Sequence, residues 1–139
     1  MERITSFIHS IIPDVEVIYE DNEFYVDLED YTINVGIDPD PQGDELIQDF
    51  IFEKFGVAME PFLIGILHEI GHIMTYDEDM IYEGEMLYHM IRMNYNPKAF
   101  KEYSYMYFSI PSELAATTWA VNYYVAHQEE CDEFVDLVL

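Results

Sequence analysis

Hydrophobic positions near the N-terminus follow two different periods. Over residues 3–12 they recur at helical spacing, which predicts an amphipathic helix that Pro13 ends. Three short runs then alternate between apolar and polar positions, which is the period of a β-strand. Turn residues separate the runs, so we expect a small antiparallel three-stranded meander. The runs are residues 15–19, 24–28 and 31–37.

After a loop at residues 38–43 the pattern changes to helical spacing for the rest of the chain. Asp44 is suited to cap the first of these helices, and Gly56 to end it in a left-handed conformation. Pro61 begins the next helix, where its missing N–H group costs nothing. Further helices are expected over residues 82–94, 97–108, 113–126 and from 128 onward. With 139 residues, the chain is expected to form one α+β domain, mainly helical with a small antiparallel sheet.

The helix that begins at Pro61 is apolar nearly all round, except for one polar face made of His68, Glu69 and His72. Residues four apart lie above one another on a helix, so His68 and His72 can reach the same point. Ionisable groups on a buried helix are costly unless they pair or bind a metal. Two imidazoles suit Zn²⁺, and an adjacent carboxylate suits the deprotonation of a zinc-bound water. We interpret the H-E-x-x-H pattern as a zinc site with Glu69 as general base; two buried histidines capped by a carboxylate are the plainer alternative.

Two histidines hold zinc poorly alone, so a third protein ligand is expected. A metzincin would have a glycine near position 75 and a ligand near position 78, but Thr75 stands at the first of these positions and Glu78 at the second, so that class is disfavoured. Asp77 and Asp79 are possible ligands, although an acidic turn is more often only solvated. Glu113 is the better candidate, because Ala116 and Ala120 follow it on one helix face and allow close packing. The alternative is that Glu113 only stabilises the first turn of its helix.

The motif His68-Glu-Ile-Gly-His72, followed by Glu113-x-x-Ala116-x-x-Trp119-Ala120, resembles the ImmA/IrrE family of zinc metallopeptidases. That family pairs an H-E-[LI]-G-H helix with a later E-x-x-A-x-x-[FW]-A helix, and the resemblance covers residues 61–126. It implies a zincin-like domain with a small sheet against the metal helix. It also implies His68, His72 and Glu113 as zinc ligands and Glu69 as general base. Family members occur in phages and mobile elements, and some cleave DNA-binding repressors.

The formal net charge of −24 disfavours direct binding to nucleic acid, because phosphates would be repelled. For a peptidase, the same charge favours a basic protein substrate, such as a DNA-binding repressor. The alternative function is an acidic decoy, a DNA mimic that binds basic proteins and carries a structural or vestigial metal site. A di-iron bundle is disfavoured, because the E-x-x-H at Glu69 and His72 has no second copy.

A peptidase also needs a group that stabilises the oxyanion. His89, Tyr103, Tyr105 and Tyr107 are candidates, and packing is the alternative role for each. An extended substrate is expected to pair with the strand at residues 31–37. The N-terminus lacks the features of a signal peptide, no apolar run is long enough for a bilayer, and Cys131 is the only cysteine. We therefore expect a cytoplasmic protein without membrane contact.

Overall fold

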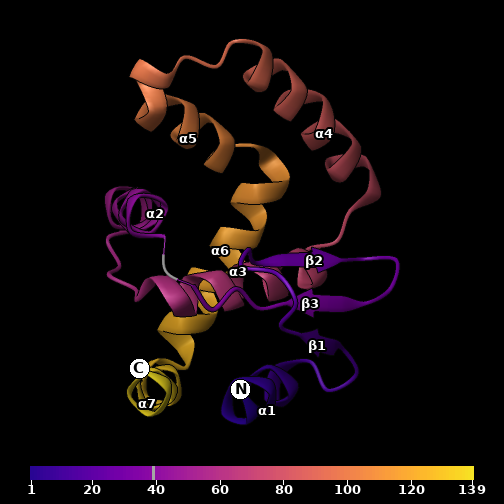
Figure 1. Ribbon diagram of the computed structural model, residues 1–139, viewed down its shortest axis with the longest axis vertical. Helices are drawn as coiled ribbons and strands as arrows, with labels where there is room; N and C mark the ends of the chain where they lie inside the picture. Colours follow the sequence, from indigo (N-terminus) through magenta and orange to yellow (C-terminus); the bar gives the residue numbers. More distant parts are fainter. Residues whose placement is uncertain (39) are drawn as a thin grey trace.

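The computed structural model describes residues 1–38 and 40–139, and within them the α+β fold is confirmed. Helix α1 (Glu2–Ile11) precedes three short strands, and helices make up nearly all of the remainder (Figure 1). The strands are β1 (Glu16–Ile18), β2 (Tyr25–Asp27) and β3 (Thr32–Asn34). The later helices are α2 (Pro41–Phe55), α3 (Pro61–Met74), α4 (Glu78–Met93), α5 (Phe100–Phe108), α6 (Pro111–Ala126) and α7 (Gln128–Val138), with a short 3₁₀ helix, η1 (Pro97–Ala99), before α5.

The sheet is mixed, so the all-antiparallel meander expected from the sequence is wrong. Its order is β1-β3-β2, in which β3 pairs parallel with β1 and antiparallel with β2. The buried side chain of Asn34 explains why β1 and β2 do not form a hairpin. Its amide nitrogen donates to the carbonyls of Asp21 and Glu23, and its oxygen accepts from the N–H groups of Glu20 and Asp21. The loop after β1 is therefore bound to β3, and the chain continues to the far side of that strand.

Two helix starts differ from the predicted positions. The side chain of Asp40, rather than that of Asp44, caps α2 by accepting from the backbone of the first turn, and Pro41 takes the first helical position. Pro39, in the loop predicted at residues 38–43, lies outside the described residues. Asp77 caps α4, which therefore begins earlier than predicted. The left-handed end of α2 at Gly56 is confirmed, with φ 69°.

Helix α3 lies at the centre of the hydrophobic core. Ile66, Leu67 and Ile70 on this helix are fully buried, as expected for a helix that is apolar on most sides. The sheet covers one side of α3, and α6 crosses the other on its way from the α4–α5 end to the α1–α7 end (Figure 1). The chain termini lie close together, where Phe7 of α1 stacks on Phe134 of α7. Among the described residues, no helix is both long and apolar enough to cross a membrane.

Candidate metal centre

His68 and His72 project from one face of α3, one turn apart. Their ring centroids lie 4.6 Å apart with nearly perpendicular planes. The helix that carries them is fixed at its start, where the Glu60 side chain accepts from the N–H groups of Phe62 and Leu63. Both imidazoles present Nε2 to the same carboxylate on α6, as the spacing of the two histidines predicts.

That carboxylate belongs to Glu113. Its Oε2 lies 2.7 Å from Nε2 of His72 and 3.4 Å from Nε2 of His68. The close approach of α6 to α3 depends on Gly71, because a Cβ there would overlap the backbone carbonyl of Ala116. Both helices present a small residue at the crossing point, which explains how Glu113 reaches the histidines. The predicted juxtaposition of these three side chains is confirmed.

The three side chains are close enough to hold a metal ion, since one donor atom from each lies within 4.8 Å of the others. Oε2 of Glu113 is buried and has no hydrogen-bond partner among the described residues, although two imidazole nitrogens face it. A buried anionic oxygen without such a partner is costly. Two nitrogens and one oxygen that converge on one point are a donor set that could hold a divalent metal ion with an open coordination position.

Two further side chains, Thr117 and Tyr107, hydrogen-bond to the candidate donors. Tyr107 was expected from the sequence only as a candidate for oxyanion stabilisation, and Thr117 was not expected at the site. Oγ1 of Thr117 lies 3.0 Å from Nδ1 of His68. If Nδ1 carries the proton, Nε2 keeps its lone pair for a metal. The hydroxyl of Tyr107 donates to Oε1 of Glu113 at 2.6 Å, which leaves Oε2 directed at the histidines. Thr117 follows Glu113 by one helical turn, and that spacing was the only sequence signal for its role.

The pKa values of the two acidic groups shift in opposite directions. Burial raises the pKa of the Glu69 carboxyl. The charges of His68 and His72 lower this pKa, the charge of Glu113 raises it, and the net shift is upward. Burial alone would also raise the pKa of Glu113. When they carry a proton on Nε2, the imidazoles of His68 and His72 donate to its carboxylate and attract its charge, and this holds the pKa well below its usual value. Carboxyl groups whose pKa values diverge in this way are suited to different tasks. Glu113 is the permanent anion, and Glu69 is the group suited to exchanging a proton.

Two hollows meet at this centre. The first, about 420 Å³, includes His72 in its lining, and the second, about 350 Å³, includes His68. Glu69 lines both, although its side chain is largely buried. Phe24, Tyr107 and Glu113 are also shared, so the hollows are two arms of one cleft. A chain lying along this cleft would pass the three donors and Glu69 together.

Strand β2 borders the first arm of the cleft through Tyr25 and Val26. It is an edge strand, whereas β3 is paired on both sides. The expectation that the strand at residues 31–37 receives an extended substrate is therefore wrong, because its backbone groups already bond to β1 and β2. Edge strand β2 has the free backbone groups that such pairing needs.

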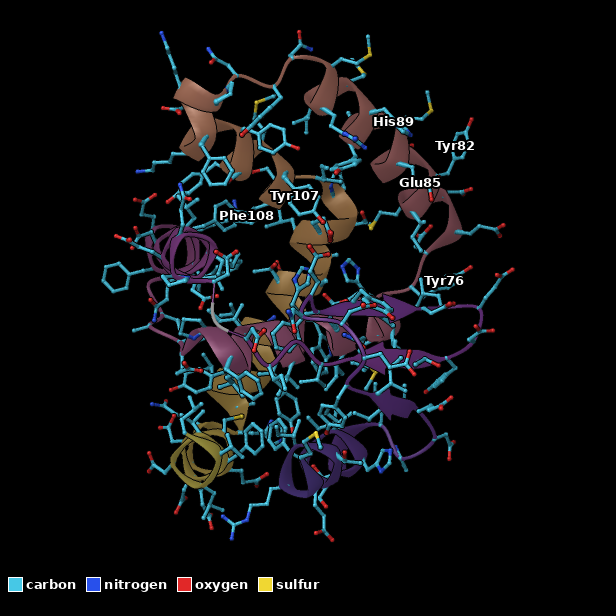
Figure 2. All side chains as sticks on the ribbon, in the orientation of Figure 1. Tyr76, Tyr82, Glu85, His89, Tyr107 and Phe108 are labelled. Atoms are coloured by element: carbon cyan, nitrogen blue, oxygen red, sulfur yellow. The ribbon has the colours of Figure 1, made fainter. Side chains whose placement is uncertain are left out.

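The four candidates for oxyanion stabilisation separate clearly. Tyr107 lies inside the molecule and lines both arms of the cleft (Figure 2). His89 is exposed on α4, and Tyr103 packs edge-on against Tyr95, with ring centroids 4.6 Å apart. Tyr105 packs against Phe50 of α2, and burial raises the pKa of its phenol to about 12. Those three lie away from the centre, as their alternative packing or surface roles would require.

Asp77 and Asp79, the alternative ligands, lie at the start of α4. The side chain of Asp77 accepts from the N–H of Met80 and caps the helix, and Asp79 is exposed in the first turn. Glu85 and Tyr88 of the same helix line the first arm of the cleft, and no pattern in the sequence indicated them.

Comparisons with models of protein families, with curated proteins and with solved structures found no match to this chain.

Proposed function

We propose that this protein is a zinc-dependent metallopeptidase that hydrolyses a peptide bond in a protein substrate. The observation that carries the proposal is the convergence of His68, His72 and Glu113 in a cleft that Glu69 also lines. The resemblance of the two motifs to ImmA/IrrE peptidases, made on sequence alone, supports the same function. The acidic surface favours a basic substrate, such as a DNA-binding protein.

Zinc bound by these three side chains would supply a Lewis acid and lower the pKa of water towards about 7. Glu69 then accepts a proton from the attacking water and passes it to the leaving amine. Burial raises the pKa of the Glu69 carboxyl, which favours its holding the proton between the two transfers. An extended peptide pairs with the free edge of β2, which holds the scissile bond in the cleft.

Tyr107 has two roles in this mechanism. Its hydroxyl donates its single hydrogen to Oε1 of Glu113. To stabilise the developing oxyanion, that hydrogen has to turn from Glu113 to the substrate, and the place of Tyr107 in both arms of the cleft suits it to do so. Burial and the charge of Glu113 raise the pKa of its phenol, so the group remains a hydrogen-bond donor at neutral pH. Of the four tyrosine and histidine candidates, this is the one whose position supports a role at the centre.

Metal analysis and cleavage together test the proposal. Protein purified without added metal is expected to hold about one zinc per chain, whereas His68→Ala is expected to lose it. Wild-type protein and Glu69→Gln are then each incubated with a peptide library derived from basic proteins, and new termini are mapped by mass spectrometry. New termini should form with wild type alone, while Glu69→Gln keeps its zinc.

Two outcomes would contradict parts of the proposal. A zinc-free wild-type protein that cannot be loaded with zinc would rule out the metal centre. Zinc binding without any cleavage that depends on Glu69 would rule out the peptidase and favour the acidic decoy, whose single supporting observation is the net charge of −24. The decoy would bind basic proteins in a salt-sensitive way and leave them intact.

A further inference from the structure

Helix α4 has an inner face that packs and an outer face that carries unusual side chains. On the inner face Gly84 and Ile91 are buried, and Tyr88 lines the cleft. The opposite face would ordinarily be polar. Instead it carries four large apolar side chains at intervals of four, four and three residues, which place them on one stripe. The stripe consists of Tyr82 at 65% exposure, Met86 at 53%, Met90 at 61% and Met93 at 85%.

A contiguous exposed apolar stripe indicates an interaction site, whereas scattered exposed hydrophobic residues do not. Tyr82 projects outward from α4 (Figure 2), and no segment of the described chain packs over the stripe. Three of its four members are methionines, whose flexible and polarisable side chains adapt to partner helices of varied shape. A helix that offers apolar side chains at this spacing is suited to pack against another amphipathic helix.

The charges around the stripe indicate which partner fits. Asp79 and Glu83 lie on the same side of α4 as the stripe and are exposed, while Arg92 and His89 lie near its other end. The net charge of −24 repels both a second copy of the chain and an anionic membrane surface. A helix with a basic flank meets neither obstacle, and its basic side would align with the first half of α4.

We propose that the outer face of α4 docks an amphipathic helix of a partner protein that carries basic residues beside its apolar face. The docked helix contacts Met86 and Met90 with its apolar side chains and Asp79 and Glu83 with its basic ones. This surface depends neither on the metal nor on the peptidase activity. Because the inner face of α4 lines the cleft, the docked protein is held next to the metal centre.

The test uses three synthetic peptides with fluorescent labels. One has a leucine-rich apolar helical face flanked by lysine, the second has the same face flanked by glutamate, and the third is a scrambled lysine peptide. Anisotropy titrations compare the wild type with the double variant Met86→Gln/Met90→Gln and with Phe52→Gln, which changes a residue on α2 that is 60% exposed. Circular dichroism verifies that each variant is folded.

The lysine-flanked amphipathic peptide is expected to bind the wild type and Phe52→Gln alike, and Met86→Gln/Met90→Gln at least about tenfold more weakly. The scrambled peptide should not distinguish these proteins. Asp79→Asn/Glu83→Gln should weaken binding and reduce its salt dependence. Glu129→Gln/Glu133→Gln removes the same charge from exposed positions on α7, and it should leave binding unchanged.

Equal binding to the wild type and the methionine double variant would overturn the proposal, as would equally tight binding of the glutamate-flanked peptide. Two further measurements address the other occupants. A dimer in sedimentation analysis that Met86→Gln/Met90→Gln disperses would assign the stripe to a second copy. Binding to phosphatidylserine-containing vesicles that the same variant abolishes would assign it to a membrane.

Discussion

Helices α6 and α4 both border the cleft, but they are held in different ways. Helix α6 meets α3 at the level of the backbone, where Gly71 lies beneath the carbonyl of Ala116. Helix α4 is held by side chains, and the corresponding close approach at Gly84 is to the hydroxyl of Ser112. The candidate metal donors lie on α3 and α6, whose separation this backbone contact fixes. The helix that is proposed to bind a partner is the one whose contacts can adjust.

The largest expected effect is the loss of zinc affinity when a donor on the α3–α6 pair is removed. Loss of a residue that only orients a ligand typically reduces metal affinity by ~10–100-fold, so Glu113→Ala, which removes a donor, should exceed that range. Competition with a chelator measures the zinc affinity. Glu85→Ala is the matched control, because Glu85 lines the cleft from α4 outside the cluster of donors. If both variants bound zinc equally well, Glu113 would not be a ligand.

Two glycine substitutions test the difference in packing directly. Gly71→Ala forces a methyl group against backbone and should reduce the free energy of unfolding by about 1–3 kcal/mol, and it should also weaken zinc binding. Gly84→Ala should cost less than about 1 kcal/mol, because the Ser112 hydroxyl can rotate and alanine favours a helix. Urea denaturation measures both, and equal losses would contradict the comparison.

The next largest effect is expected when the hydrogen bond that orients His68 is removed. Thr117→Val keeps the shape of the side chain but removes the hydroxyl beside Nδ1, and zinc affinity should fall by about tenfold. Thr118→Val is the control, since its hydroxyl donates to the Leu114 carbonyl rather than to the centre. A matching loss in Thr118→Val would indicate a general effect on α6.

Zinc affinity should also depend on pH, because protons compete for the imidazole nitrogens. Burial would lower the pKa of His68, but the hydrogen bond that its protonated ring donates to Glu113 and the charges of Glu69 and Glu113 outweigh it and raise the pKa above its usual value. Without metal, His68 therefore holds its proton to a higher pH than usual. Affinity should fall by about tenfold per pH unit below the raised pKa and level off above it, as zinc titrations across neutral pH would show. A flat profile would contradict proton competition at His68.

The smallest effect is expected on the outer face of α4. Met86→Gln/Met90→Gln should change the free energy of unfolding by less than about 0.5 kcal/mol, since both side chains are more than half exposed. Urea denaturation again provides the measurement. A loss as large as that of Gly71→Ala would show that these methionines stabilise the fold rather than remain available for a partner.

The features that the sequence could predict depend on local spacing. His68 and His72 share a helix, so their juxtaposition follows from helical geometry. The pairing of Glu113 with them was predictable because Ala116 indicated a close helix crossing. Its partner across the crossing, Gly71, is also a residue expected from the sequence to let neighbouring backbone approach closely, and the Ala116 backbone lies against it.

The features that the sequence could not predict depend on contacts between distant segments. Strands of three residues pair through few backbone bonds, so their order is decided by Asn34 and the loop that it binds. The choice of Tyr107 among the tyrosines of α5 depends on how the turn after Phe108 orients α5 against α6. Glu85 and Tyr88 were missed for a similar reason, because only the packed helices show which face of α4 borders the cleft.

Both ends of the chain emerge beside each other, at the α1–α7 end of the molecule and opposite α4 and α5 (Figure 1). An affinity tag or fluorescent domain fused at either terminus would therefore leave the cleft and the outer side of α4 unobstructed. Linking the termini and reopening the chain elsewhere is also geometrically feasible. The protein could thus be immobilised by this end for every titration described above.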